Sequence, residues 1–263
     1  MLRADRAALL GALHGPAELV PVSSSAHVAL LPWLAGWEEA DLEPALRKAL
    51  EVALHAGTTV GLLWLQRADV AGMLVALDRR RTTVLALSLL PPAIVGAACE
   101  RPVEERLGTP RAIAARLVAG ALALLVADAR GDRRRGATEA GVLDGLALGL
   151  AQACALIPGV SRRGATLTAA RARGFDASAA SALSWEVALP VLGAATALKG
   201  VRLAQDPPRQ EVRRALLAGA AAALVSTLAG APLLRAVERG PWWPYGVWRL
   251  GLAAAAGLKA RSA

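Results

Sequence analysis

The chain has 263 residues, of which 55% are hydrophobic, 3% are aromatic and 19% are charged, and its formal net charge is +9. Soluble domains average about 25% charged residues, and disordered chains hold few apolar ones, so the composition argues against both classes. The remaining class is an integral membrane protein. At about 20 residues per span, the chain has room for roughly six to eight membrane segments in a single domain, residues 1–263.

The positive charge comes almost wholly from arginine, because lysine occurs only at Lys48, Lys199 and Lys259. The arginines cluster between apolar stretches, which is typical of loops that face anionic headgroups and not of a nucleic-acid surface with stacking aromatics. Cys99 and Cys154 share no CxxC motif or pair spacing. A disulfide framework or a zinc site is therefore not expected.

Apolar stretches of helical length follow one another along the chain and predict membrane helices. Arginine excess at 79–81 and 130–135 predicts cytoplasmic linkers, whereas 100–111, which balances Arg with Glu, is predicted to be external. A further linker is predicted at 205–214. The candidate spans are two charge-free stretches, 82–99 and 215–234, and four less uniform ones, 52–66, 112–127, 187–198 with extensions at both ends, and 247–258.

Two regions, 14–37 and 142–170, fit no simple span. The first holds GPAELVPVSSSAH between apolar ends, and the second holds IPGVSRRGAT. Proline and runs of hydroxyl residues break a helix, and such backbone is tolerated at membrane depth only where protein or a watery cavity surrounds it. Both regions are therefore predicted to be re-entrant, broken helix hairpins.

The two halves of the chain resemble each other. Aligning Pro21 with Pro158 places Ser24 on Ser161, and a nearly equal offset places EVAL at 51–54 on EVAL at 186–189. Matching interrupted segments are the sign of an inverted repeat with its site at the interface, here of two repeats at about 1–135 and 136–263. The alternative is coincidence in a chain rich in Ala and Leu.

The first broken region gathers groups suited to nucleophilic catalysis. Ser24, His27 and Glu18 are a hydroxyl, a base and an acid within ten residues, flanked by Ser23 and Ser25. Ionisable groups at membrane depth are functional by default. The alternative is that the serines cap a helix that begins after Ser25 and that His27 satisfies a backbone carbonyl.

The second broken region predicts a phosphate cradle. Loop amides, the hydroxyls of Ser161 and Thr166, and the guanidinium groups of Arg162 and Arg163 precede a helix N-terminus. Residues 159–166 nearly match a nucleotide-binding loop, but Ala165 replaces its lysine and no strand precedes it. The alternative is an arginine pair at the edge of a cytoplasmic loop.

Other polar or small residues have simpler interpretations. His55 is predicted to be a polar contact inside the bundle and not a ligand. Gly141, Gly145 and Gly149 recur at four-residue spacing and predict close helix packing. An interfacial aromatic belt is predicted before the last helix, at Trp242, Trp243, Tyr245 and Trp248.

With both motifs in place, the chain resembles the undecaprenyl-diphosphate phosphatase family linked to bacitracin resistance. GPAELVPVSSSAH is similar to that family's EGxTEFLPVSSTGH-like signature, PGVSRRGAT to its PGxSRSGxT, and ASALSWEVALPVLGA and PYGVWRLGLA also look familial. The resemblance implies an all-α polytopic helical bundle with two re-entrant hairpins and an inverted repeat. It also implies cleavage of an isoprenyl diphosphate to the monophosphate plus phosphate, with Glu18, Ser24, His27 and Arg162 as catalytic residues and a phosphate-binding group of Ser23, Ser25, Ser161, Arg163 and Thr166.

Two departures from the family pattern concern charge. His14 stands where the family has the first of two glutamates, and Arg163 stands where it has a second serine. If that acid helps to hold Mg²⁺ or Ca²⁺ against the diphosphate, His14 is a modulator that lowers the dependence on these cations, and Arg163 supplies positive charge instead. The alternative is that both side chains point away from the cavity.

We therefore expect a multi-pass phosphatase of the bacterial plasma membrane that recycles the lipid carrier of cell-wall synthesis. Its expected partners are an isoprenoid diphosphate lipid and the bilayer, with a homodimer as an open alternative and no role for nucleic acid. The residues do not decide whether Ser24 attacks or His27 activates water. The rival functions are an isoprenoid lipid-phosphate transporter or flippase, since broken helices in an inverted repeat are transporter architecture, and an inactive lipid-phosphate binder.

Overall fold

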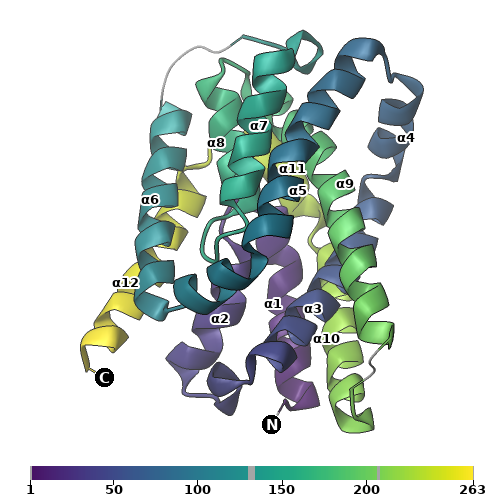
Figure 1. The fold of residues 1–263 in the computed structure, drawn as a ribbon. Coiled ribbons are helices and arrows are strands. Elements are labelled where there is room, and N and C mark those ends of the chain that lie inside the picture. The colour runs from purple at the N-terminus through teal and green to yellow at the C-terminus, as the bar shows by residue number, and fades with distance from the viewer. Residues whose placement is uncertain (1, 130–133, 206–207, 263) are drawn as a thin grey trace.

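The computed structural model describes residues 2–129, 134–205 and 208–262 and is helical throughout these ranges (Figure 1). Their only β feature is an isolated bridge between Arg135 and Phe175. The all-α prediction is thus confirmed. The helices are α1 (Ala4–Leu19), α2 (Ser24–Ala35), η1 (Glu38–Asp41), α3 (Pro44–Leu65), α4 (Arg67–Val75), α5 (Arg79–Leu107), α6 (Pro110–Ala129), η2 (Ala137–Glu139), α7 (Val142–Cys154), α8 (Arg162–Ala172), α9 (Ala177–Gln205), α10 (Gln210–Ala229), α11 (Ala231–Arg239) and α12 (Trp243–Ser262).

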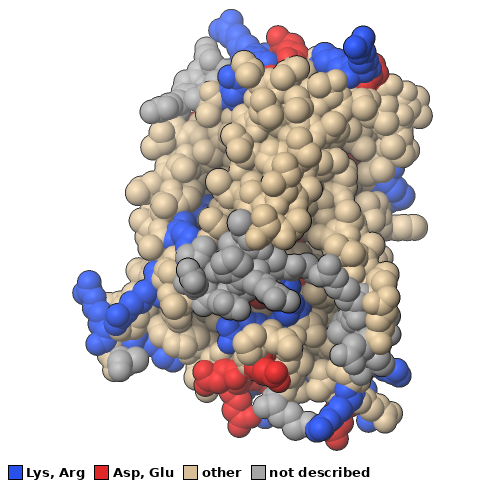
Figure 2. Space-filling model, viewed as in Figure 1, with Lys and Arg blue, Asp and Glu red and all other residues tan. Residues whose placement is uncertain are grey.

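Within the described ranges, four helical stretches are long and apolar enough to cross a bilayer: Arg79–Ala98, Pro110–Ala129, Ala177–Leu198 and Gln210–Ala229. On the face that Figure 2 shows, the described charged side chains are most numerous toward the two ends of the molecule, and apart from the residues drawn in grey, few lie on the surface between these ends. An apolar band between charged ends matches a bilayer core between two aqueous interfaces. The chain is a multi-pass membrane protein.

Several predicted boundaries are wrong. Residues 79–81, predicted as a linker, form the first turn of α5, and 210–214 of the linker predicted at 205–214 belong to α10. The charge-free stretch 215–234 is not one helix, because α10 ends at Ala229, Gly230 follows, and α11 begins at Ala231 with Pro232 in its first turn. The linker predicted at 100–111 is mostly helical, since α5 continues to Leu107.

Two predicted linkers lie partly outside the described residues. These are 130–135, of which 130–133 are not described, and 205–214, of which 206 and 207 are not described. In Figure 1 the start of α5 and the end of α6 lie at one end of the bundle, and the α5–α6 turn lies at the other.

Each predicted broken region forms two short helices joined by a non-helical segment. The pair α1–α2 occupies one half of the molecule and α7–α8 the other (Figure 1). The first pair breaks after Leu19, and α2 begins at Ser24 and not after Ser25 as the capping alternative requires. That these two helix pairs re-enter a bilayer stays a prediction, as do the inverted repeat and the division of the chain into two repeats.

Glycines let the helices that carry the two motifs pack closely. A methyl group placed on Gly15 of α1 would lie 2.6 Å from the backbone nitrogen of Thr227 in α10. On α7, methyl groups on Gly145 and Gly149 would lie 2.8 and 2.6 Å from backbone oxygens of α5, whereas Gly141 faces open space. Two of the three predicted packing glycines therefore allow close helix contact, as small residues do between membrane helices.

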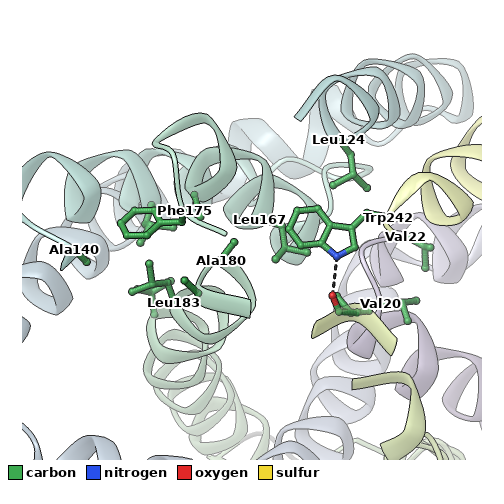
Figure 3. Packing of buried hydrophobic residues seen from close by; sticks show 14 of the residues in the cluster. Val20, Val22, Leu124, Ala140, Leu167, Phe175, Ala180, Leu183 and Trp242 are labelled. Carbon is green, nitrogen blue, oxygen red and sulfur yellow. Dashed lines mark hydrogen bonds between the residues drawn. The ribbon is translucent and has the colours of Figure 1, made fainter. Parts of the chain in front are cut away.

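A buried cluster surrounds the α7–α8–α9 side of the bundle, where Phe175, Leu167, Leu183 and Trp242 pack together (Figure 3). Trp242 is fully buried and donates its indole N–H to the carbonyl of Val237 over 2.7 Å. Its assignment to an interfacial belt is therefore wrong, although Trp243 and Trp248 are more than half exposed. Burial of an indole needs a hydrogen-bond acceptor, which the end of α11 provides.

Candidate active site

The turn between α1 and α2 places the first motif. Ser23 is the N-cap of α2, and its hydroxyl accepts from the backbone N–H of Ala26 over 3.4 Å. With φ of 74°, it is the only non-glycine residue in the described ranges with a left-handed backbone. Such strained conformations persist where the surroundings fix them, and they cluster at functional sites. Ser24, the first residue of α2, is thereby turned back toward the end of α1.

Glu18 lies at the centre of the two motifs. The hydroxyl of Ser24 donates to Oε2 of its carboxylate, and Nη2 of Arg162 pairs with Oε1. The Arg162–Glu18 pair joins α8 to α1 across 144 positions of the chain. Both Glu18 and Ser24 are buried, whereas Arg162 is partly exposed, so the hydroxyl, the acid and the guanidinium group form a hydrogen-bonded row that reaches water at the arginine.

His27 faces a different set of partners. Its Nδ1 lies 2.8 Å from the carbonyl of Ser23, and its Nε2 lies 2.8 Å from the indole nitrogen of Trp248. A carbonyl can only accept and an indole can only donate, so the proton is on Nδ1 and the lone pair on Nε2. The structure therefore brings Ser24 to Glu18, and the nearest base to that hydroxyl is the acid and not the imidazole. The contact of His27 with a backbone carbonyl also agrees with part of the simpler interpretation.

The second motif begins α8. Ser161 is its N-cap and accepts from the N–H of Gly164 over 3.1 Å, which leaves the helix N-terminus beside Arg162. Thr166 is fully buried, and its hydroxyl contacts the carbonyl of Arg162 at 3.0 Å and the hydroxyl of Ser184 at 2.7 Å. Thr166 thus braces the first turn of α8 against α9. Of the second-motif side chains, Arg162 is the one that contacts the first motif.

Arg163 points into the protein. Its Nη2 donates to Ser181 over 3.0 Å, and its guanidinium group lies 4.0 Å from the ring centre of Trp185, both on α9. Nε and Nη1 are buried without a hydrogen-bond partner. The side chain of Arg163 therefore lies at the α8–α9 interface, and its described contacts are with α9 and not with Glu18.

His14, one turn before Glu18 on α1, lies against α3. Its Nδ1 is 2.8 Å from the hydroxyl of Thr58, and its ring meets that of His55 edge-on with ring centres 4.5 Å apart. The side chain of His14 thus points toward Glu18 and His55 and not away from the site. The carboxylate of Glu18 and the two imidazoles form one group of potential ligand atoms.

Trp248 and Arg249 on α12 also lie beside the two motifs, although neither was predicted as a site residue. A methyl group on Gly164 would lie 2.9 Å from Nη1 of Arg249, which places this buried guanidinium group at the first turn of α8. Its Nε and Nη2 have no hydrogen-bond partner. The available signal was an arginine within an apolar helix, which is costly in a membrane and marks a functional position.

Comparisons with known proteins show which family the chain belongs to. The family model described as bacitracin resistance protein BacA matches residues 7–255. The chain is 38% identical to an undecaprenyl-diphosphatase of Geobacter sulfurreducens, with 93% of each chain covered, and 36% identical to that of Geobacter metallireducens, again with 93% of each covered. It is 33% identical to the undecaprenyl-diphosphatase of Moorella thermoacetica, with 95% of each chain covered. The chain belongs to the bacitracin resistance protein BacA family.

Proposed function

We propose that this protein is an integral membrane phosphatase that hydrolyses undecaprenyl diphosphate to the monophosphate and phosphate. The observation that carries the proposal is the hydrogen-bonded row of Ser24, Glu18 and Arg162, which unites the two motifs. The names of the relatives support the substrate. In the bacterial plasma membrane, this reaction returns the lipid carrier to cell-wall synthesis and opposes bacitracin.

Phosphoryl transfer depends mainly on holding the phosphate and neutralising its charge. Arg162 and the free amides at the N-terminus of α8 bind the terminal phosphate. Ser24 transfers its proton to Glu18 while its oxygen bonds to the terminal phosphorus, and the bond from that phosphorus to the bridging oxygen breaks. The lipid monophosphate leaves, and water then releases phosphate from the serine.

The second route uses water directly. Nε2 of His27 carries the lone pair, so it takes a proton from water once Trp248 moves away. The water oxygen then bonds to the terminal phosphorus while the bond from that phosphorus to the bridging oxygen breaks, and phosphate and the lipid monophosphate are released. The contact between Ser24 and Glu18 favours the serine route. All residues of either route come from one chain, so a homodimer is not needed for this chemistry.

The groups beside Glu18 do not fit Mg²⁺ or Ca²⁺, which the family resemblance suggested. These ions prefer oxygen ligands, whereas the cluster offers two imidazole nitrogens and one carboxylate. No step is therefore assigned to either ion. We propose that hydrolysis depends less on Mg²⁺ or Ca²⁺ than in relatives with an acid in place of His14.

The test is phosphate release from undecaprenyl or farnesyl diphosphate by the purified protein in detergent. Release by the unmodified protein, with loss in Glu18→Gln and retention in Arg67→Lys, supports the phosphatase. Arg67 is a control on exposed α4, where its guanidinium group contacts the carbonyl and the ring of the neighbouring Trp64. Binding of the diphosphate without release supports the inactive binder. Movement of the lipid phosphate between leaflets of a vesicle without release supports the flippase.

A further inference from the structure

Two histidines and one glutamate meet where α1 packs against α3. His14 and Glu18 lie one turn apart on α1, and His55 faces them from α3. One potential ligand atom from each residue lies within 4.8 Å of the other two. These are two of the three histidines in the chain, so their meeting is not a product of abundance.

The hydrogen bond of His55 leaves a lone pair for a ligand, and that of His14 allows one, because the hydroxyl of Thr58 can accept a proton from Nδ1. Nδ1 of His55 lies 2.8 Å from the carbonyl of Glu51, which can only accept, so the proton is on Nδ1 and Nε2 is bare. Nδ1 of His14 bonds to the hydroxyl of Thr58, and its Nε2 is buried with no hydrogen-bond partner. A buried nitrogen without a partner needs an explanation, and a ligand that the structure does not contain is one.

The donor set identifies the class of ligand. Two neutral imidazoles and a carboxylate are the protein ligands of many open zinc sites, in which Zn–N and Zn–O bonds are about 2.0–2.2 Å long. Tetrahedral ligands at that bond length are about 3.4 Å apart, so small side-chain rotations bring the present separations into range. Thr58 and the carbonyl of Glu51 are the outer partners that orient metal-binding imidazoles.

We propose that His14, Glu18 and His55 form a site for a divalent transition-metal ion that prefers nitrogen ligands, such as Zn²⁺. The site occupies the place where the family pattern has a glutamate in the position of His14, and the exchange of oxygen for nitrogen changes the metal that fits. Glu18 also contacts Ser24 and Arg162, so the ion lies next to the reacting groups. Its part in hydrolysis rests on the proposed phosphatase function, whereas the binding does not.

Metal binding is measured directly on the protein, purified with a tag that lacks histidine. After treatment with a chelator, the protein is incubated with Zn²⁺ or Mg²⁺ and desalted, and the bound metal is determined by mass spectrometry. About one Zn²⁺ and no Mg²⁺ per chain is expected. Co²⁺ in place of Zn²⁺ supplies a second readout, because its visible absorption reports nitrogen ligands and coordination number.

Variants test the assignment of ligands. His55→Gln removes one nitrogen from a half-buried position and is expected to weaken Zn²⁺ binding at least tenfold in competition with a coloured chelator, since loss of an outer partner alone costs 10–100-fold. His27→Gln is the matched control, because it removes the remaining histidine of the chain, and it is expected to bind Zn²⁺ as tightly as the unmodified protein. Thermal unfolding and gel filtration establish that each variant is folded.

Less than half an equivalent of Zn²⁺ in the unmodified protein overturns the proposal, as does equal affinity in His55→Gln and His27→Gln. His14→Ala removes the other nitrogen ligand and is expected to weaken Zn²⁺ binding as His55→Gln does; if it does not fold, His55→Gln decides alone. The two proposals fail separately: release of phosphate by a protein that binds no Zn²⁺ leaves the phosphatase intact, and one Zn²⁺ bound without phosphate release leaves the metal site intact.

Discussion

The indole N–H of Trp248 donates to Nε2 of His27 over 2.8 Å, and the two rings are stacked with 9° between their planes. The imidazole is held from its other side by the carbonyl of Ser23. Trp248 therefore covers the one nitrogen of His27 that can accept a proton. Any reaction that uses this nitrogen as a base requires the indole to move. Because more than half of Trp248 is exposed, little packing opposes that movement.

Trp248→Phe separates the packing of this ring from its hydrogen bond. Phenylalanine keeps an aromatic ring beside the imidazole but frees Nε2, so we expect phosphate release to fall less than about tenfold. His27→Gln removes the base of the water route, where a positioned acid–base group contributes about 10²–10⁴-fold, whereas the serine route, with Glu18 as base, predicts a smaller loss. Turnover of both variants on farnesyl diphosphate is the measurement. Equal losses in the two would mean that Trp248 itself is needed.

Arg162→Lys tests the ion pair with Glu18. An ammonium group keeps the charge but cannot form the two parallel bonds with which a guanidinium group binds phosphate oxygens. We expect turnover to fall by about 10²-fold, because this is the typical effect of losing one hydrogen-bond donor to the charge that develops in the transition state. Arg67→Lys, on exposed α4, is the matched control and should keep full turnover. Near-normal activity of Arg162→Lys would remove Arg162 from the site.

Ser24→Ala and Ser23→Ala divide the roles of adjacent serines. Ser24 donates to Glu18, so its loss should abolish turnover through the serine route while the melting temperature stays close to that of the unmodified protein. Ser23 is the N-cap, and loss of a cap costs about 1 kcal/mol, a shift of a few degrees for a chain of this size. Differential scanning fluorimetry and phosphate release are measured on both. Retained turnover in Ser24→Ala favours the route through water and His27.

His14→Glu restores an oxygen ligand beside Glu18 and should raise the dependence of hydrolysis on Mg²⁺ or Ca²⁺, because these ions prefer carboxylates. Phosphate release is measured against free divalent cation for the unmodified protein, His14→Glu and the double variant His14→Glu with Arg163→Ser. Arg163 lies against Ser181 and Trp185, so we expect its replacement to change the cation curve less than that of His14. Identical curves for all three proteins would contradict the role of His14.

Asp144 predicts a dependence of stability on pH. Burial alone would raise the pKa of this carboxyl group, but hydrogen bonds from Arg135, the N–H of Gly141 and Arg173 lower it to about 2. Since the pKa is lower in the folded than in the unfolded protein, the stabilisation is complete above the unfolded value near 4 and is lost as the pH falls toward 2.

Asp144→Asn should therefore lower the free energy of unfolding by about 1–3 kcal/mol near neutral pH, the worth of hydrogen bonds to a charged group. The loss should be smaller near pH 3 than at pH 7. Asp5→Asn is the control, because the Arg3–Asp5 pair is more than half exposed and such pairs add little. Melting curves from pH 3 to pH 8 measure both variants, and a constant difference across this range would contradict the assignment.

The site around Glu18 shows which features the sequence predicted and which depend on the tertiary structure. Residue types within ten positions identified Glu18, Ser24 and His27, but spacing alone did not decide whether the hydroxyl faces the acid or the imidazole. The left-handed backbone of Ser23 decides it by turning Ser24 toward α1. His55, predicted as a polar contact of the bundle, meets Glu18 only because α3 packs against α1.

The sequence by itself determined the class of protein, because long uncharged apolar stretches can bury their backbone polar groups in a bilayer only as helices. It also determined the chemical groups of the site, which are written in two short motifs. Only the tertiary structure decided which groups touch. The pairing of Arg162 with Glu18 spans 144 positions, and that of His27 with Trp248 spans 221. Contacts at such separations depend on how helices pack, and local spacing along one helix carries no information about the neighbour on another.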